Sequence, residues 1–559
     1  MLKTKIVSSQ EKIFMDDRIE AFAALDKISV LQGERLSLQF LSTYRATAET
    51  PVLYRKERIP LQVQGSLSSL ATLRDVRQVP VTLPCYPENR DDNFLRTTPG
   101  LYPDLLTPLQ YDGSVTVQPD VLSAVWVELP IPEDLPAGEY SLSFSLSGVN
   151  MGASESSVLI EVIGACLPKD EIYLTQWFHC DCLANYYGVE VFSERHWEIV
   201  ESFVQTAVKN GINLLLTPVF TPPLDTAVGS ERRTVQLVGV ERNAGVYRFD
   251  FTLLDRWIGM CDRQGIRYFE ISHLFTQWGA MHAPKIMATV DGEYRRLFGW
   301  ETDATGEEYS TFLRTFLGEF LAHMKRRGDD RRCFFHISDE PSFTKHRESY
   351  EAARAVVADL LADYVVMDAL SNFEFYKTGL VTTPIPASNR ITPFLEADIP
   401  HLWTYYCCGQ QQNVSNRFVA MPAWRTRSIG MQFYKYDIAG FLQWGYNFYN
   451  NQVSDSPIDP YQELSANYAF PAGDAFSVYP APDGSAYEST RIIVFHEALQ
   501  DYKAMKLCER YYGKKAVVDA IEAVFGKSIT FDTCARSSDM MLRIRATVNK
   551  MIKEAILEF

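Results

Sequence analysis

"ERHWEIVESFVQTAVKNGINLLLTPVF", residues 194–220, decides the fold class. Its first half places apolar side chains three or four positions apart, which predicts an amphipathic helix. Its second half is an apolar run of strand length. An apolar strand directly after a helix is typical of an α/β domain, in which helices cover both faces of a parallel sheet. The same unit recurs along the middle of the chain.

Eight apolar segments after about residue 172 predict parallel strands, with helix-like segments such as 307–328 and 348–363 between them. No glycine fingerprint follows the first strand, which argues against a dinucleotide-binding domain. Eight strands over roughly 300 residues predict a (β/α)8 TIM-like barrel rather than an open doubly wound sheet. The predicted strands are 173–179, 212–220, 267–275, 333–338, 364–371, 380–386, 401–408 and 440–448.

The regions on either side of the predicted barrel have different patterns. Residues 1–168 contain short apolar stretches separated by Pro, Gly and Asp turns, which predict an N-terminal β-sandwich. "CLPKDE", residues 166–171, has the composition of a linker. We expect the barrel to span 169–490 and a helical C-terminal segment, 491–559, to pack on it.

The net charge of −16 on 559 residues excludes nucleic acid and anionic membranes as partners. No apolar stretch is long enough to span a membrane and the N-terminus has no signal-peptide core, so a cytoplasmic location is expected. The ten cysteines include "HCDC" (179–182) and "CC" (407–408), but neither has the CxxC spacing usual for zinc. We therefore expect no metal and no cofactor.

The active site of such a barrel lies at the C-terminal ends of its strands. Those ends carry few carboxylates and many aromatic and amide side chains, which suits a neutral, polyhydroxylated ligand: a sugar or small oligosaccharide. Because side chains alternate along a strand, only one of Tyr405 and Tyr406 should face the pocket. The predicted sugar contacts are Trp177, His179, His273, Trp278, Trp403, Tyr405, Tyr406, Trp444 and Asn447.

"HISDEP", residues 336–341, places Asp339 and Glu340 together at the end of the fourth predicted strand. Sugar hydrolysis normally takes two carboxylates, and Glu340 suits the acid because an apolar, aromatic site raises a carboxyl pKa. The last two strands contain no Asp or Glu, so the usual nucleophile is missing. The carbonyl oxygen of a substrate's 2-acetamido group can replace it, while Asp339 orients the acetamido N–H.

Three alternatives stay open at this point. Asp339 could instead cap a helix that starts at Pro341. The enzyme could cleave a sugar without an acetamido group, using Asp368 or Glu270 as the second carboxylate. The chain could also be a non-catalytic carbohydrate-binding protein.

Several motifs resemble the catalytic domain of glycoside hydrolase family 123, which includes many members of unknown function. They are "FHISDEP", "DALS", "GFLQWGYNFY" and "GDAFSVYPAPDG…STR", and the resemblance covers roughly residues 170–510. It implies a retaining, substrate-assisted β-N-acetylgalactosaminidase with a consecutive Asp-Glu pair. Carried over, Asp339 would polarise the acetamido group and Glu340 would be the general acid/base. The resemblance implies the identity of the sugar less firmly than the fold and the mechanism.

Overall fold

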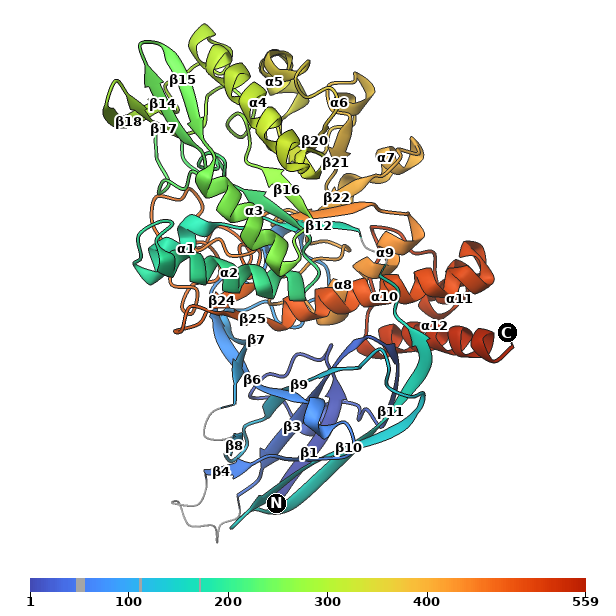
Figure 1. Ribbon diagram of the computed structural model, residues 1–559. Helices are drawn as coiled ribbons and strands as arrows, with labels where there is room; N and C mark the ends of the chain where they lie inside the picture. The colour runs from blue at the N-terminus through green and yellow to red at the C-terminus, as the bar shows by residue number, and fades with distance from the viewer. Residues whose placement is uncertain (47–55, 110–112, 170–171, 559) are drawn as a thin grey trace.

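The computed structural model describes residues 1–46, 56–109, 113–169 and 172–558. Figure 1 shows a sheet-rich N-terminal region at the bottom, a mixed α/β region at the top, and C-terminal helices between them. Residues 170 and 171 of the predicted linker lie outside the described residues.

Two sheets pack face to face in the N-terminal region. Phe40 and Phe144 come from opposite sheets, and their ring centroids are 5.6 Å apart in a shared apolar core. This agrees with the predicted sheet-rich region. The five-stranded sheet has the order β1 (Leu2–Ser8), β3 (Arg35–Tyr44), β9 (Ser123–Pro130), β6 (Thr72–Val81) and β7 (Gly100–Pro108). The four-stranded sheet has the order β2 (Lys27–Gln32), β11 (Gly152–Cys166), β10 (Gly138–Gly148) and β5 (Gln62–Gln64), and β4 (Glu57–Pro60) pairs with β8 (Ser114–Val117) beside them.

Eight short parallel strands form the centre of the α/β region, one within each predicted segment. Every strand ends before its predicted end, because the apolar character that predicted it continues into the buried loops beyond. One sheet contains β12 (Tyr173–Gln176), β23 (Gly440–Gln443) and β22 (Trp403–Tyr405). The other contains β13 (Leu214–Thr217), β16 (Tyr268–Ile271), β19 (Cys333–Phe335), β20 (Val365–Ala369) and β21 (Thr383–Ile385).

Backbone hydrogen bonds connect the two parallel sheets at both of their edges. The Asn213 N–H donates to the Leu174 carbonyl at 3.2 Å, just before β13 and within β12. At the other edge, the Tyr405 N–H in β22 donates to the Pro386 carbonyl after β21 at 3.1 Å. Each strand therefore has its neighbours in chain order beside it, and the C-terminal ends of all eight point the same way.

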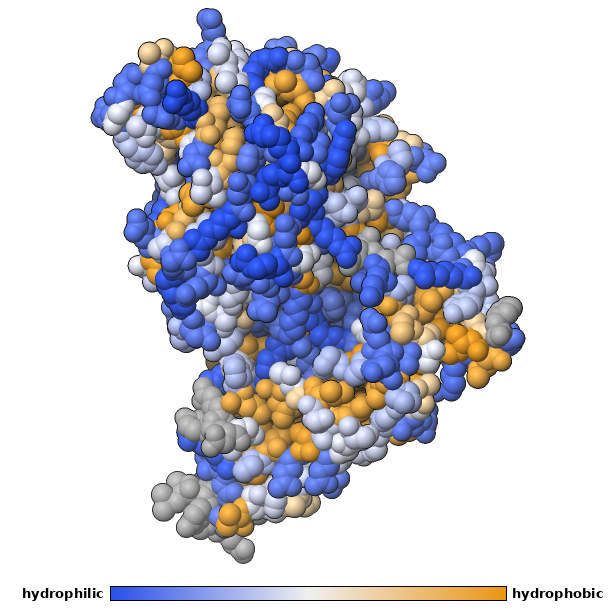
Figure 2. Space-filling view, in the orientation of Figure 1, coloured by the Kyte–Doolittle hydropathy of each residue, from blue (hydrophilic) through white to orange (hydrophobic). Residues whose placement is uncertain are grey.

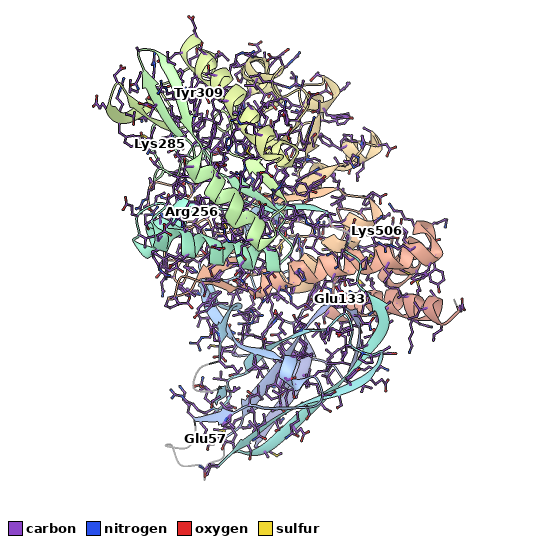
Figure 3. All side chains as sticks on the ribbon, viewed as in Figure 1. Glu57, Glu133, Arg256, Lys285, Tyr309 and Lys506 are labelled. Carbon is purple, nitrogen blue, oxygen red and sulfur yellow. The ribbon has the colours of Figure 1, made fainter. Side chains whose placement is uncertain are left out.

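Helices connect these strands and cover their outer faces (Figure 1). In α2, which the opening stretch predicted, Ser193 caps the first turn and the apolar stripe is buried. Arg256 on α3, labelled in Figure 3, forms an ion pair with Glu194 at the start of α2. The α-helices of the α/β region are α1 (Cys180–Tyr187), α2 (Glu194–Lys209), α3 (Thr252–Gln264), α4 (Glu307–Arg327), α5 (Phe343–Val357), α6 (Glu374–Lys377), α7 (Thr392–Glu396), α8 (Ala423–Arg427) and α9 (Ile429–Lys435).

Between β13 and α4 the chain also forms a four-stranded sheet that the sequence analysis did not predict. Its order is β15 (Val246–Asp250), β14 (Gly239–Asn243), β17 (Ile286–Val290) and β18 (Glu293–Phe298). A further hairpin, β24 (Val478–Pro480) and β25 (Ala486–Glu488), precedes the C-terminal helices.

Three helices, α10 (Thr490–Tyr512), α11 (Lys514–Phe525) and α12 (Ser538–Glu558), end the chain. Arg491 at the start of α10 forms a buried two-bond ion pair with Asp104 of β7, at 2.8 and 2.9 Å, which joins the two regions. In the part of the chain described, no helix combines the length and apolar character needed to cross a membrane. The face seen in Figure 2 is largely hydrophilic over the α/β region, and hydrophobic residues gather over the N-terminal sheets.

Candidate active site

A cavity of about 170 Å³ lies at the C-terminal ends of the parallel strands. Aromatic side chains form much of its wall, and the described residues that line it include no Lys, Arg or His. Its carboxyl, amide and phenol side chains near the strand ends come from β13, β16, β19 and β22 or the loops that follow them. They are Asp225, Gln277, Asp339, Glu340 and Tyr405.

Asp339 and Glu340 both line this cavity although they are neighbours in sequence. On a strand they would point to opposite faces. Here β19 has ended at Phe335, and Glu340 adopts a left-handed backbone conformation with φ of 43°. Two backbone hydrogen bonds of 3.0 Å fix this turn. The Trp278 N–H donates to the Asp339 carbonyl, and the Glu340 N–H donates to the Ala369 carbonyl. Such strain persists where surrounding contacts fix it, and it is concentrated at functional sites.

Asp339 is 6% exposed, and among the described residues its carboxyl has one hydrogen-bond donor, Gln277, whose Nε2 lies 2.8 Å from Oδ2. Burial, reinforced by the charge of Glu340, raises the pKa of Asp339 well above its usual range. Tyr309 on α4 (Figure 3) donates its hydroxyl to the Leu274 carbonyl at 2.5 Å and so anchors the loop that carries Gln277. Asp339 therefore has a fixed orientation and one oxygen available to a ligand.

Glu340 lies at the junction of the cavity and an open groove of about 690 Å³. The Tyr405 hydroxyl donates to Glu340 Oε1 at 2.5 Å, and Tyr405 also lines both spaces. Glu340 itself is exposed. A carboxylic acid at this position can reach a bond that joins a group in the cavity to a group in the groove.

A second set of carboxylates is buried beneath the cavity. Glu270 and Asp368 are both 0% exposed, and His336 lies between them, with its Nε2 2.7 Å from Glu270 Oε1 and its Nδ1 3.3 Å from Asp368 Oδ1. Burial opposes a charge on His336, but its bonds to Asp368 and Glu270 outweigh that effect and raise its pKa to about 10. This set is an internal ion network rather than part of the cavity wall.

Four of the nine predicted sugar contacts line the cavity: Trp177, Trp278, Tyr405 and Trp444. Trp278 is 45% exposed and has a left-handed φ of 56°, so its ring stands at the cavity mouth. Trp444 is held by a 2.9 Å bond from its Nε1 to Asp474 Oδ2.

The other five predicted contacts lie outside the cavity because each is used in packing. His179 accepts a 3.0 Å hydrogen bond from Arg232 at its Nδ1 and donates from its Nε2 to the Trp444 carbonyl, also at 3.0 Å. Asn447 binds the His179 backbone. His273 stacks on His336 at 4.3 Å. Trp403 stacks on Tyr173 at 5.4 Å, at the start of the strands, and Tyr406 packs against Phe441. Strand position alone does not separate these residues from the ones that face a ligand.

Asp225 is a cavity carboxylate that the sequence analysis missed. It lies in the long loop after β13, with a left-handed φ of 45°, and donates its N–H to Gln277 Oε1 at 2.5 Å. Burial raises its pKa to about 7. Within the described ranges, no cluster of three or more His, Cys, Asp or Glu side chains has the arrangement of a metal site.

A separate cavity of about 470 Å³ lies between the N-terminal sheets and α12. Several of its charged side chains pair with one another: Arg545 contacts Glu34, and Arg427 contacts Glu497 at 3.0 Å. It is far from the strand ends and lacks the Asp339–Glu340 pair, so we place the chemistry at the strand ends.

Parallel strands that present a carboxylate pair and aromatic rings in one cavity match the kind of site that a glycoside hydrolase uses. The family model of the glycoside hydrolase 123 catalytic domain matches residues 177–508, more than half of the chain. The chain belongs to this family.

The whole chain superposes on a family 123 glycoside hydrolase from Clostridium perfringens, whose structural analysis concerned glycolipid glycan hydrolysis. The TM-score is 0.73 at 14% identity, covering 100% of this chain and 98% of that one, so the likeness establishes the fold. A Bacteroides ovatus family 5 xyloglucanase, 8% identical over 85% of this chain and 98% of its own, reaches a TM-score of 0.28 and carries no argument. No curated protein matches the chain.

Proposed function

We propose that this glycoside hydrolase removes a terminal β-linked N-acetylhexosamine, with N-acetylgalactosamine favoured, by a retaining, substrate-assisted mechanism. The observation that carries the proposal is the separation of the carboxylates. Asp339 and Glu340 line the cavity, whereas Glu270 and Asp368 are sealed around His336. The substrate would be a small molecule or an oligosaccharide.

Asp339 and Glu340 take different roles in this mechanism. The free oxygen of Asp339 accepts the acetamido N–H, which directs the acetamido carbonyl oxygen at the anomeric carbon. As that C–O bond forms, Glu340 gives its proton to the departing glycosidic oxygen. Glu340 then takes a proton from the water that opens the oxazolinium ring, and the product keeps its anomeric configuration. Retention follows because the anomeric carbon is attacked twice.

The position of Glu340 supports a sugar in the cavity and a leaving group in the groove. Tyr405 would hold the acid toward the glycosidic oxygen through its 2.5 Å bond to Oε1. Trp177, Trp278 and Trp444 would contact the sugar ring. A glycan chain extending into the groove would fit the glycolipid glycan hydrolysis studied for the Clostridium perfringens relative.

Glu270 and Asp368 are poor candidates for a second catalytic carboxylate. Glu270 accepts from Trp177 Nε1 at 2.7 Å as well as from His336, and Asp368 accepts from the Tyr350 hydroxyl and from two backbone N–H groups. A nucleophile in either position would have to break this buried network to reach a sugar. The acetamido group of the substrate is therefore a better nucleophile than either of these two carboxylates.

We also propose that the eight parallel strands close into one (β/α)8 barrel and that the chain divides at about residues 168 and 490. The bonds of Asn213 to Leu174 and of Tyr405 to Pro386 support closure, since they bridge both edges of the two sheets. The cytoplasmic location stays a prediction from the N-terminal sequence.

Aryl N-acetyl-β-galactosaminide, aryl N-acetyl-β-glucosaminide and aryl β-galactoside test the proposed reaction. The wild-type enzyme should cleave the first fastest and the third very slowly. A thiazoline analogue of the oxazolinium ion should inhibit strongly, because it resembles the intermediate. Turnover of the plain galactoside alone would contradict the proposal, and cleavage of no glycoside would favour a carbohydrate-binding protein.

A further inference from the structure

The polar side chains of the cavity are not equally available to a sugar. Both ends of the Gln277 amide are occupied, by the Asp225 N–H and by Asp339. Tyr405 donates to Glu340, and Asp339 and Glu340 are assigned to the acetamido group and the glycosidic oxygen. A hexosamine in the cavity would still have ring hydroxyl groups to satisfy, because burying them without partners is costly.

The Asp225 carboxylate is the cavity acid that this assignment leaves free. It lines the cavity, and among the described residues no side chain or backbone group donates a hydrogen bond to it. Gln452, which also lines the cavity, is exposed at its mouth. Asp225 is therefore the strongest unassigned acceptor on the inner wall.

The backbone holds Asp225 in position before any ligand arrives. Its N–H is bound to Gln277, and the carbonyl of the preceding Leu224 accepts from Arg232 Nη1 at 3.1 Å and from the Thr226 hydroxyl at 2.9 Å. Arg232 is itself fixed by a buried two-bond pair with Asp181, at 2.7 and 2.9 Å. Hydrogen bonds at Asp225 and at Leu224 fix the left-handed backbone conformation of Asp225. The carboxylate is therefore preorganised, which lowers the entropic cost of binding a ligand.

We propose that the Asp225 carboxylate accepts hydrogen bonds from ring hydroxyl groups of the sugar, and so determines which hexosamine the cavity accepts. This inference rests on the proposed function, because it takes the sugar in the cavity to be the one that is cleaved. Asp225 is a specificity residue in this scheme and takes no part in proton transfer or bond formation.

The test uses 4-nitrophenyl N-acetyl-β-galactosaminide and its 3-, 4- and 6-deoxy forms, with kcat and KM measured separately. Asp225→Asn and Asp225→Gly are the variants, since both residues tolerate a left-handed φ and so keep the loop conformation. Asp519→Asn, on an exposed position of α11, is the matched control. Unchanged thermal unfolding establishes that each variant folds.

In the wild-type enzyme, removing a hydroxyl that Asp225 binds should lower kcat/KM about 10- to 100-fold, as expected for a hydrogen bond to a charged group. Both Asp225 variants should lose a similar factor on the parent sugar and should no longer discriminate against that deoxy form. Asp519→Asn should behave as wild type. Equal deoxy penalties in the wild type and the variants would overturn the inference while leaving the proposed function intact.

Two other outcomes overturn more than the role of Asp225. If azide restores Asp225→Gly and a glycosyl azide is formed, Asp225 is the nucleophile, and the substrate-assisted mechanism fails with it. If the wild-type enzyme cleaves no N-acetylhexosaminide, the proposed function fails, and the sugar-specificity role assigned to Asp225 fails as its consequence.

Discussion

Two groups of acidic side chains lie one above the other in this protein, and they have opposite surroundings. Glu270 and Asp368 share the imidazole of His336 and are sealed from solvent. Asp225, Asp339 and Glu340 line a cavity whose described lining residues include no cation. Acidic side chains therefore serve structure where a buried cation neutralises them and are available to a ligand where none does.

This difference explains how one strand can carry both roles. His336 follows β19 by one residue and belongs to the lower group, and Asp339 and Glu340, three and four residues later, belong to the upper one. The strand ends at Phe335, and the left-handed turn at Glu340 then lets both Asp339 and Glu340 line the cavity. Each of the following variants tests whether a residue belongs to its assigned layer.

The largest effect is expected for Glu340→Gln. Loss of the acid should lower kcat/KM by about 10²- to 10⁴-fold, the usual contribution of general acid–base catalysis. The loss should be smaller for aryl substrates whose leaving group needs little protonation, so the ratio between a poor and a good leaving group is the measurement. A uniform loss across leaving groups would remove Glu340 from the acid role.

His336→Gln should mainly affect stability. The change leaves Glu270 and Asp368 buried without their cation, which should lower the free energy of unfolding by about 3–5 kcal/mol. His273→Phe is the matched control, because the His273 ring stacks on His336 but neither of its nitrogens has a hydrogen-bond partner within the described structure. The free energy of unfolding of that variant, measured by denaturant unfolding, should stay within about 1.5 kcal/mol of the wild-type value. Equal losses in both variants would show that stacking, and not the ion network, carries the stability.

Tyr405→Phe should lower kcat about 10- to 100-fold, because a hydrogen bond to a charged group contributes about 1.5–3 kcal/mol. Its control is Tyr406→Phe, whose hydroxyl is buried without a partner in the described structure. Removing that hydroxyl should leave kcat almost unchanged. If the two variants behave alike, the Tyr405 bond to Glu340 has no role in positioning the acid.

The last expected effect is a change of stability with pH. In the folded protein His336 keeps its proton up to a pKa of about 10, whereas in the unfolded chain it loses the proton near 6.5. The stabilisation from this charge is thus fully present below pH 6.5 and is lost as the pH rises through 10. Thermal unfolding between pH 6.5 and 10 should show this decline in the wild type, and His336→Gln should lack that component. The same slope in both proteins would mean that His336 is neutral in the fold.

Much of the fold could be predicted from sequence, because buried parallel strands are apolar along their whole length and the helices between them are amphipathic. Because the buried loops after the strands are apolar too, the sequence did not show at which residue each strand ends. The sheet formed by β15, β14, β17 and β18 was missed although Asp291-Gly292 between β17 and β18 is a recognisable hairpin turn.

The site was less predictable than the fold. The Asp339–Glu340 pair has a local sequence signal, but whether His273 or Trp403 faces a ligand depends on packing partners far away in the chain, such as His336 and Tyr173. Asp225 lies deep in a loop without periodicity, and its place in the cavity depends on Gln277, which is 52 residues away. No spacing rule reports such a contact.

The most direct test of the mechanism is the rate of wild-type hydrolysis as the acetamido group is fluorinated, from acetyl through mono- and difluoro- to trifluoroacetyl, on one aryl galactosaminide. Fluorine withdraws electrons from the carbonyl oxygen and makes it a weaker nucleophile. If that oxygen attacks the anomeric carbon while Asp339 orients the N–H, kcat/KM should fall steeply with each fluorine. If kcat/KM does not change along the series, the acetamido group is not the nucleophile, and a protein carboxylate must take its place.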